Sequence, residues 1–130
     1  MQLGSLTIAA LFVAFAFSAQ AADTAEPGTG GDATKGQTLW ESRCTGCHSL
    51  DQNRVGPKHR GVYGRTAGTA EGFTYSQGVK NSGVVWNEAS LDTWLTNPQE
   101  FIPGARMAFR VSTEPDRADI IAYLKSLSPE

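Results

Sequence analysis

The sequence is poor in cysteine and in positive charge, and each shortage excludes a class of protein. Its 130 residues contain only two cysteines, Cys44 and Cys47, so neither a disulfide framework nor a four-thiolate metal site can be built. Lys and Arg number 11 against 13 Asp and Glu, which gives a net charge of -2. A nucleic-acid-binding domain usually carries a basic surplus, so we expect no nucleic-acid partner. The length suits one domain with a modest core.

Long apolar runs are also scarce, and the one that exists lies at the N-terminus, from Leu6 to Phe17. It is shorter than the roughly 20 residues that span a bilayer. Small residues follow it, and Ala19-Gln20-Ala21 fits the A-x-A cleavage pattern. We therefore predict a signal peptide over residues 1–21, with the cut after Ala21 or, as the nearby alternative, after Ala22. The absence of Lys and Arg before the run departs from the usual pattern, and an uncleaved anchor is the alternative.

The rest of the chain predicts one all-α domain behind a linker. Residues 22–31 are small, polar and rich in Gly, which is typical of a flexible linker, and residues 32–130 form the predicted domain. Asp32 can cap a helix that runs to about Arg43, and Asn87 can cap a second one that ends before Asn97-Pro98. Thr113 precedes a third helix with an apolar stripe. No strand-like alternation persists between these segments.

The segment Cys44-Thr45-Gly46-Cys47-His48 carries the most specific chemistry in the chain. Two cysteines separated by two residues and followed by histidine are the attachment signature for c-type haem, with the histidine as an axial iron ligand. A zinc site would need a fourth ligand. A redox dithiol would sit in a thioredoxin-like pattern, which the neighbouring sequence lacks. We expect one covalently bound haem.

The second axial ligand is open on residue type alone. After signal removal the candidates are His59, a lysine, or Met107, the sole methionine that remains. Met107 follows the turn-rich stretch Phe101–Arg106, which can present a side chain without helical constraint. A thioether is a soft, neutral ligand that favours ferrous haem. A methionine can equally be a simple gap-filler in a core.

The sequence resembles a class I cytochrome c of the mitochondrial or soluble alphaproteobacterial type. The resemblance covers about 32–125 and rests on motifs in order: Lys35-Gly36 with Trp40, Cys44–His48, Gly56-Pro57, Gly61–Arg65, Phe73–Tyr75, Trp86, Asn97-Pro98, Ile102–Gly104 with Met107, and Arg117–Leu124. It implies a small fold in which the terminal helices cross, with short helices and long loops around one covalent haem.

The resemblance also implies roles for single residues. Met107 takes the distal ligand position, and the carbonyl of Pro57 accepts the N–H of His48. Arg65, Tyr75 and Trp86 match positions that approach a haem propionate. The helix contact involves Gly36, Trp40, Ile120 and Tyr123.

Several positions depart from the family pattern. His59 stands where a leucine is usual, and it can be a packed core histidine, a surface group or a competing ligand at high pH. Val79, Trp94 and Ala105 replace polar residues, which predicts a more apolar distal side and an altered reduction potential. Only four lysines are present, and Gln99 and Glu100 stand where lysines are expected. This predicts either weaker electrostatic steering of partners or docking tuned to a different partner.

The function implied is that of a one-electron carrier with His48 and Met107 as iron ligands, not an enzyme. The alternative is a haem enzyme or ligand sensor in which Met107 is displaceable. We expect a periplasmic monomer that has no small-molecule substrate and exchanges electrons with redox proteins. Quinol–cytochrome c reductase, a terminal oxidase, a photosynthetic reaction centre or a periplasmic dehydrogenase would fit.

Overall fold

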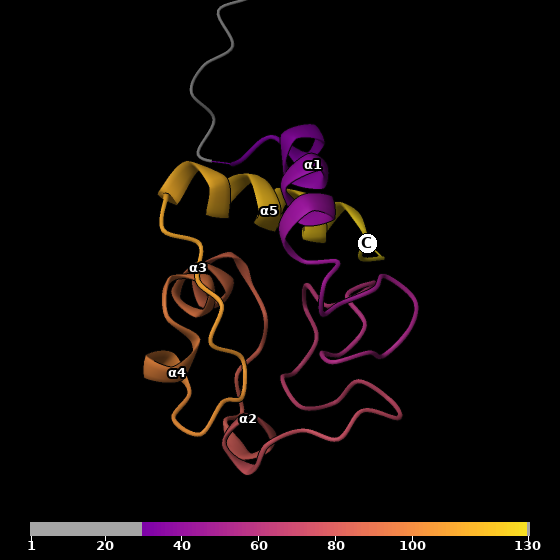
Figure 1. Ribbon diagram of the computed structural model, residues 1–130, viewed down its shortest axis with the longest axis vertical. Coiled ribbons are helices and arrows are strands. Elements are labelled where there is room, and N and C mark those ends of the chain that lie inside the picture. Colours follow the sequence, from indigo (N-terminus) through magenta and orange to yellow (C-terminus); the bar gives the residue numbers. More distant parts are fainter. Residues whose placement is uncertain (1–29, 130) are drawn as a thin grey trace, which may run out of the picture.

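The computed structural model describes residues 30–129, and these form a helical domain (Figure 1). Its five helices are α1 (Ala33–Arg43), α2 (Gln77–Asn81), α3 (Glu88–Thr96), α4 (Pro98–Phe101) and α5 (Glu114–Ser126). Within 30–129 there is no strand, and one isolated antiparallel bridge joins Thr66 to Val85. The predicted all-α class is confirmed.

Helices α1 and α5 cross at the top of the molecule in Figure 1. The carboxylate of Asp32 accepts hydrogen bonds from the backbone N–H groups of Thr34 and Lys35, so α1 begins where the sequence predicts. A Cβ at Gly36 would overlap the backbone carbonyl of Asp119. The absence of a side chain at Gly36 therefore lets the two helix backbones approach this closely.

Helix α5 begins at the predicted position but not through the predicted contact. Thr113 occupies the N-cap, yet its side chain makes no cap hydrogen bond. Pro115 in the first turn and the acidic side chains of Glu114 and Asp116 favour the helix start instead. The core side of α5 is well packed, since Ile120 is fully buried.

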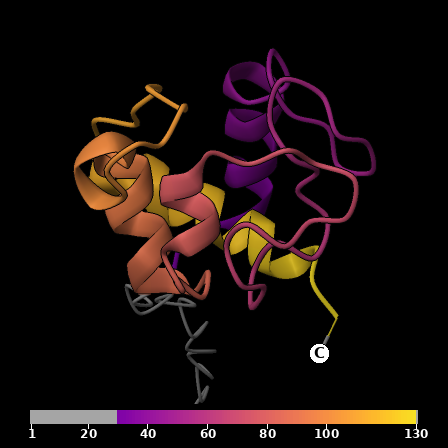
Figure 2. The ribbon, with the colours of Figure 1, turned by 90° about the horizontal axis from the view of Figure 1, so that it is seen from below.

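Helix α3 is tied to α5 by a charged contact at the edge of the core. Asn87 and Ser90 form a capping box at the start of α3. Arg117, which is 9% exposed, donates from Nε to Asp92 of α3 at 2.7 Å and from a terminal nitrogen to the carbonyl of Val111 at 3.1 Å. Seen from below, α5 contacts α1 along one part of its length and α3 along another (Figure 2).

The two shortest helices are not predicted from the sequence. The hydroxyl of Ser76 caps α2, and Pro98 begins α4 directly after α3 ends. A Cβ at Gly78 of α2 would overlap the carbonyl oxygen of Pro103, so α2 lies directly against the loop that leads to Met107. Residues 44–76 contain no helix or strand.

The predicted signal peptide and residues 22–29 of the predicted linker lie outside the described residues. They remain predictions, as do the domain boundaries. In the part of the chain that the structure describes, no helix has the length and apolarity needed to cross a membrane.

Candidate haem site

The described residues line a cavity of about 350 Å³. The eight residues predicted to contact a cofactor all line it: Cys44, Cys47, His48, Pro57, Arg65, Tyr75, Trp86 and Met107. They come from the end of α1, the irregular 44–76 segment, the residues before α3 and the loop between α4 and α5. The fold thus brings together residues that are far apart in the sequence.

One side of the cavity is built around His48. Its Nδ1 lies 2.8 Å from the carbonyl oxygen of Pro57. Because a carbonyl can only accept, Nδ1 carries the proton and Nε2 is left with a free lone pair. A Cβ at Gly56 would stand 2.6 Å from Nδ1 and 2.7 Å from Nε2, so backbone lies against the ring. Burial lowers the pKa of His48, while the Pro57 contact opposes that shift, and the neutral ring that results is the metal-binding form.

The two cysteines lie in the turn that follows α1. The backbone N–H groups of Cys47 and His48 both donate to the carbonyl of Cys44, at 3.1 and 2.9 Å. The turn holds both thiols at the cavity without a disulfide between them. Cys44 is half-buried and Cys47 exposed. Burial raises the pKa of Cys44 to about 11, so its thiol is protonated near neutral pH.

Three of the residues that line the cavity, Arg65, Tyr75 and Trp86, carry hydrogen-bond donors. A terminal nitrogen of Arg65 donates to the carbonyl of Lys58 at 3.0 Å, but its Nε is buried without a partner. The hydroxyl oxygen of Tyr75 accepts from the N–H of Ala70 at 3.2 Å, which leaves its own proton available to donate. The indole of Trp86 completes the set. A buried, unpartnered guanidinium N–H calls for an anionic acceptor.

Met107 lines the cavity from the loop between α4 and α5, among apolar neighbours. Val79 and Trp94 also line it, and the Trp94 ring packs against Trp86 with centroids 5.2 Å apart. Ala105 is buried but is not among the lining residues. Of the three positions where an apolar residue replaces a polar one, Val79 and Trp94 therefore line the cavity. Ala105 does not line it and can affect it only through the residues in between.

His59 contacts the His48 side of the cavity. Its ring stacks on His48, with centroids 3.9 Å apart and planes at 26°. Its Nδ1 accepts a hydrogen bond from the indole nitrogen of Trp40 at 2.8 Å. Burial lowers the pKa of His59 well below its ordinary value, and the neighbouring His48 and Arg65 lower it further. Of the three roles considered from the sequence, the packed core histidine agrees with this geometry. Sequence spacing gave no signal of the stack.

A family model for cytochrome c matches residues 33–128. The chain belongs to the cytochrome c family. It is 48% identical over 100 residues to cytochrome c of Euglena viridis, covering 75% of this chain and 98% of that protein. It is 46% identical over 99 residues to cytochrome c of Tetrahymena pyriformis, and the match covers 75% of this chain and 90% of that protein. The solved structure of cytochrome cH from Methylobacterium extorquens matches with a TM-score of 0.70 and 41% identity, over 74% of this chain and 99% of that one.

These likenesses confirm a class I cytochrome c with the crossed-helix fold. Members of the family bind haem c covalently, and the spacing of Cys44 and Cys47 fits the attachment motif, so the predicted cofactor is confirmed. The cavity suits this group on its own terms. It is lined mainly by apolar side chains, it has two thiols at one edge, and the unpartnered Nε of Arg65 is matched by the negative charge of a propionate.

Cytochromes c are electron carriers and not enzymes, and they act with redox partner proteins. The chain is accordingly a haem electron carrier, as predicted. In residues 30–129 no group of three or more His, Cys, Asp or Glu is arranged to hold a metal ion.

Proposed function

We propose that this cytochrome c carries single electrons with His48 and Met107 as the two axial ligands of its haem iron. The observation that carries the proposal is that both side chains line one cavity, with His48 turned so that Nε2 is its free nitrogen. The haem supplies the redox chemistry, because its iron cycles between Fe(III) and Fe(II). A soft thioether opposite an imidazole favours Fe(II) and raises the reduction potential.

The remaining predicted residues hold and tune the cofactor. Cys44 and Cys47 attach it through thioether bonds. The carbonyl of Pro57 fixes the ring of His48 and increases its basicity. Arg65, Tyr75 and Trp86 would donate hydrogen bonds to a propionate, whose charge would otherwise be costly to bury. All three residues line the cavity, the Nε of Arg65 has no other partner, and the hydroxyl proton of Tyr75 is free to donate.

The alternative is a haem enzyme or gas sensor in which Met107 leaves the iron. Such a protein needs a distal group that can exchange protons with a bound ligand. Among the residues that line the cavity, the only imidazole besides His48 is His59, and it lies against His48. Val79 and Trp94, which line the same cavity as Met107, are apolar and cannot exchange protons with a ligand. Permanent ligation, and hence electron transfer, is therefore the better-supported function.

The ligation is tested by the weak far-red absorption band that a thioether bound to Fe(III) produces. The oxidised wild-type protein should show the band at neutral pH. Met107→Leu keeps an apolar side chain and removes the sulfur, so the band should vanish and added imidazole should bind readily. Arg110→Gln, on the same loop at an exposed position that does not line the cavity, is the matched control and should keep the band. A wild-type protein without the band would refute methionine ligation and favour the enzyme or sensor.

We infer from the predicted signal peptide over residues 1–21 that the carrier works in the periplasm, where c-type haem can be attached and redox partners are available. Partners of suitable chemistry are quinol–cytochrome c reductase, a terminal oxidase, a photosynthetic reaction centre or a periplasmic dehydrogenase, each meeting a monomer. N-terminal sequencing of protein from the periplasmic fraction tests this. A chain that begins at Ala22 or Asp23 is expected, and a membrane-bound chain that retains residue 1 would favour the uncleaved anchor.

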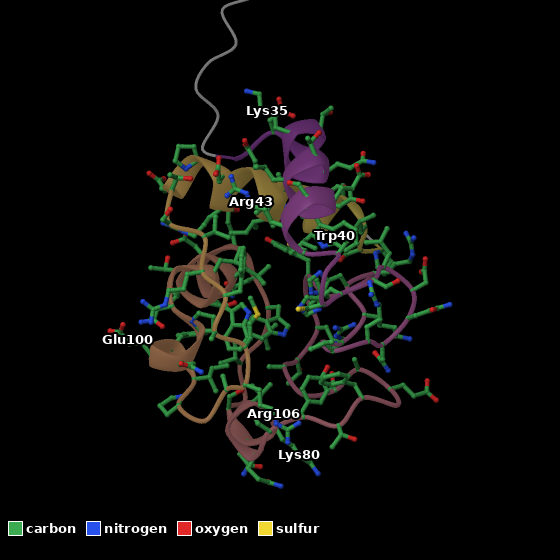
Figure 3. The ribbon with its side chains drawn as sticks, viewed as in Figure 1. Lys35, Trp40, Arg43, Lys80, Glu100 and Arg106 are labelled. Atoms are coloured by element: carbon green, nitrogen blue, oxygen red, sulfur yellow. The ribbon has the colours of Figure 1, made fainter. Side chains whose placement is uncertain are left out.

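Docking by this carrier depends less on charge than docking by a lysine-rich relative. In Figure 3, Lys35 and Arg43 lie in the upper part of the molecule, Lys80 and Arg106 lie near the bottom, and Glu100 lies at the side. The four labelled basic side chains therefore fall into two groups at opposite ends of this view. The rate of electron transfer to an acidic partner should fall only weakly as ionic strength rises. Gln99→Lys should steepen that dependence, and a steep dependence in the wild type would contradict the proposal.

A further inference from the structure

The pair formed by His59 and Trp40 belongs to no part of the function derived above. Trp40 has one polar atom, an N–H that can only donate, so the 2.8 Å contact makes Nδ1 of His59 the acceptor. In the neutral ring the proton is then on Nε2. The contact therefore selects one of the two neutral tautomers of His59 and fixes the direction of its ring.

Trp40 is itself held firmly. It lies on α1, is 5% exposed, and packs against Tyr123 of α5 with ring centroids 5.9 Å apart and planes at 56°. The position of His59 is thus set by the contact between the terminal helices, which is the most extensive helix contact in the described residues.

Three contacts determine the position and orientation of the His48 ring, and only the contact with His59 is aromatic. The Pro57 carbonyl fixes the Nδ1 atom, and the backbone at Gly56 limits the space beside the ring. A single hydrogen bond still permits rotation of the ring about the direction of that bond. The face of His59, 3.9 Å away and tilted by only 26°, opposes this rotation. The stack therefore sets the plane in which the His48 imidazole lies.

We infer that His59 is a positioning residue for the iron: it fixes the plane of the His48 ring and favours the Fe(III) state. The inference rests on the proposed ligation by His48. Fe(III) withdraws more electron density from its imidazole ligand than Fe(II) does, and an electron-poor ring stacks better on the face of a second, neutral ring. His59 therefore lowers the reduction potential, whereas a leucine at this position offers packing and no aromatic face.

Three variants separate positioning from packing. His59→Leu removes the stack and the acceptor, and His59→Phe restores an aromatic face without the acceptor. Trp40→Phe removes the N–H donor and keeps the stack, although its smaller ring also loosens the packing on Tyr123. The haem methyl resonances of the oxidised protein report the plane of the axial imidazole, and a potentiometric titration gives the reduction potential. His59→Leu should change the pattern of methyl shifts and raise the potential. His59→Phe should return both toward the wild-type values, and Trp40→Phe should give a smaller change in the same direction as His59→Leu.

Ile121→Ala is the control for a purely structural effect. Ile121 is 3% exposed on α5 and does not line the cavity, so its truncation should lower the melting temperature and leave the methyl shifts and potential unchanged. If His59→Leu behaves like Ile121→Ala, the inference is overturned while His48 ligation stands. If the wild-type protein lacks the hyperfine-shifted signals of an iron-bound His48 ring, the proposed ligation and this inference are both overturned.

Discussion

The contact at Gly36 predicts that one added methyl group will weaken the whole domain. A Cβ on Gly36 would stand 2.9 Å from the Cβ of Tyr123 and would overlap the backbone carbonyl of Asp119. Separations under 3.0 Å are essentially never found for real Cβ atoms. Backbone cannot rotate away as a flexible side chain does, so Gly36→Ala must move α1 and α5 apart.

The magnitude follows from two opposing effects. Overpacking a well-packed core costs about 1–3 kcal/mol, and a clash with backbone lies at the upper end of that range. Alanine also favours a helix interior over glycine by about 1 kcal/mol. The net loss is then about 2 kcal/mol, and each kcal/mol lowers the melting temperature of a domain of this size by roughly 4–8 °C. Separation of the helices also disturbs Trp40 against Tyr123 and the 2.9 Å ion pair of Arg43 with Asp116.

The assay is thermal unfolding of the haem-loaded protein, followed by far-UV circular dichroism. Gly36→Ala should unfold well below the wild type. Gly30→Ala is the matched control, because a Cβ there meets nothing within 4 Å, and it should melt with the wild type. If the melting temperature of Gly36→Ala equals or exceeds that of the wild type, helix propensity outweighs the clash and the close approach of the helices is refuted.

Arg65→Gln removes a positive charge from the cavity wall. Because a nearby cation disfavours Fe(III), this change should lower the reduction potential measured by potentiometric titration. An unchanged potential would place the Arg65 side chain away from the haem. The pKa of Asp116 is lowered below its ordinary value of 3.8, first by a hydrogen bond with Thr113. The ionised carboxylate of Asp116 therefore stabilises the folded state above pH 3.8, and this stabilisation is lost as the pH falls through the lowered pKa. Asp116→Asn should therefore melt below the wild type at neutral pH, with the gap closing in acid, and a gap that persists in acid would contradict the assignment. The double variant Val79→Asn with Ala105→Thr should alter both the reduction potential and the alkaline pH at which Met107 is displaced, and identical values in the two proteins would exclude an effect of distal polarity.

Much of the fold could be predicted because its signals are local. Asp32 and Asn87 cap helices at the predicted positions, since a short polar side chain satisfies N–H groups only two or three residues away. The close approach of α5 at Gly36 agrees with the helix contact that the family resemblance implies for this residue. The cofactor was predictable for the same reason, because the Cys44–His48 signature lies within five consecutive residues.

What could not be predicted depends on contacts between distant segments. The stack of His59 on His48 and its bond to Trp40 join residues that only the folded chain brings together. Helix α2 is too short for a periodic pattern to reveal it. Ala105 resembles Val79 as an apolar replacement, yet only Val79 lines the cavity, and no property of the sequence distinguishes the two.

The crossing of α1 and α5 also sets an order of events in time. Helix α1 begins at Ala33, and its main partner is completed only at Ser126, three residues before the last described one. A chain that is synthesised or exported from its N-terminus presents Cys44 and Cys47 long before α5 is available. Both thiols are thus accessible to an attachment machinery while the domain is still open, and the arrival of the last helix closes it.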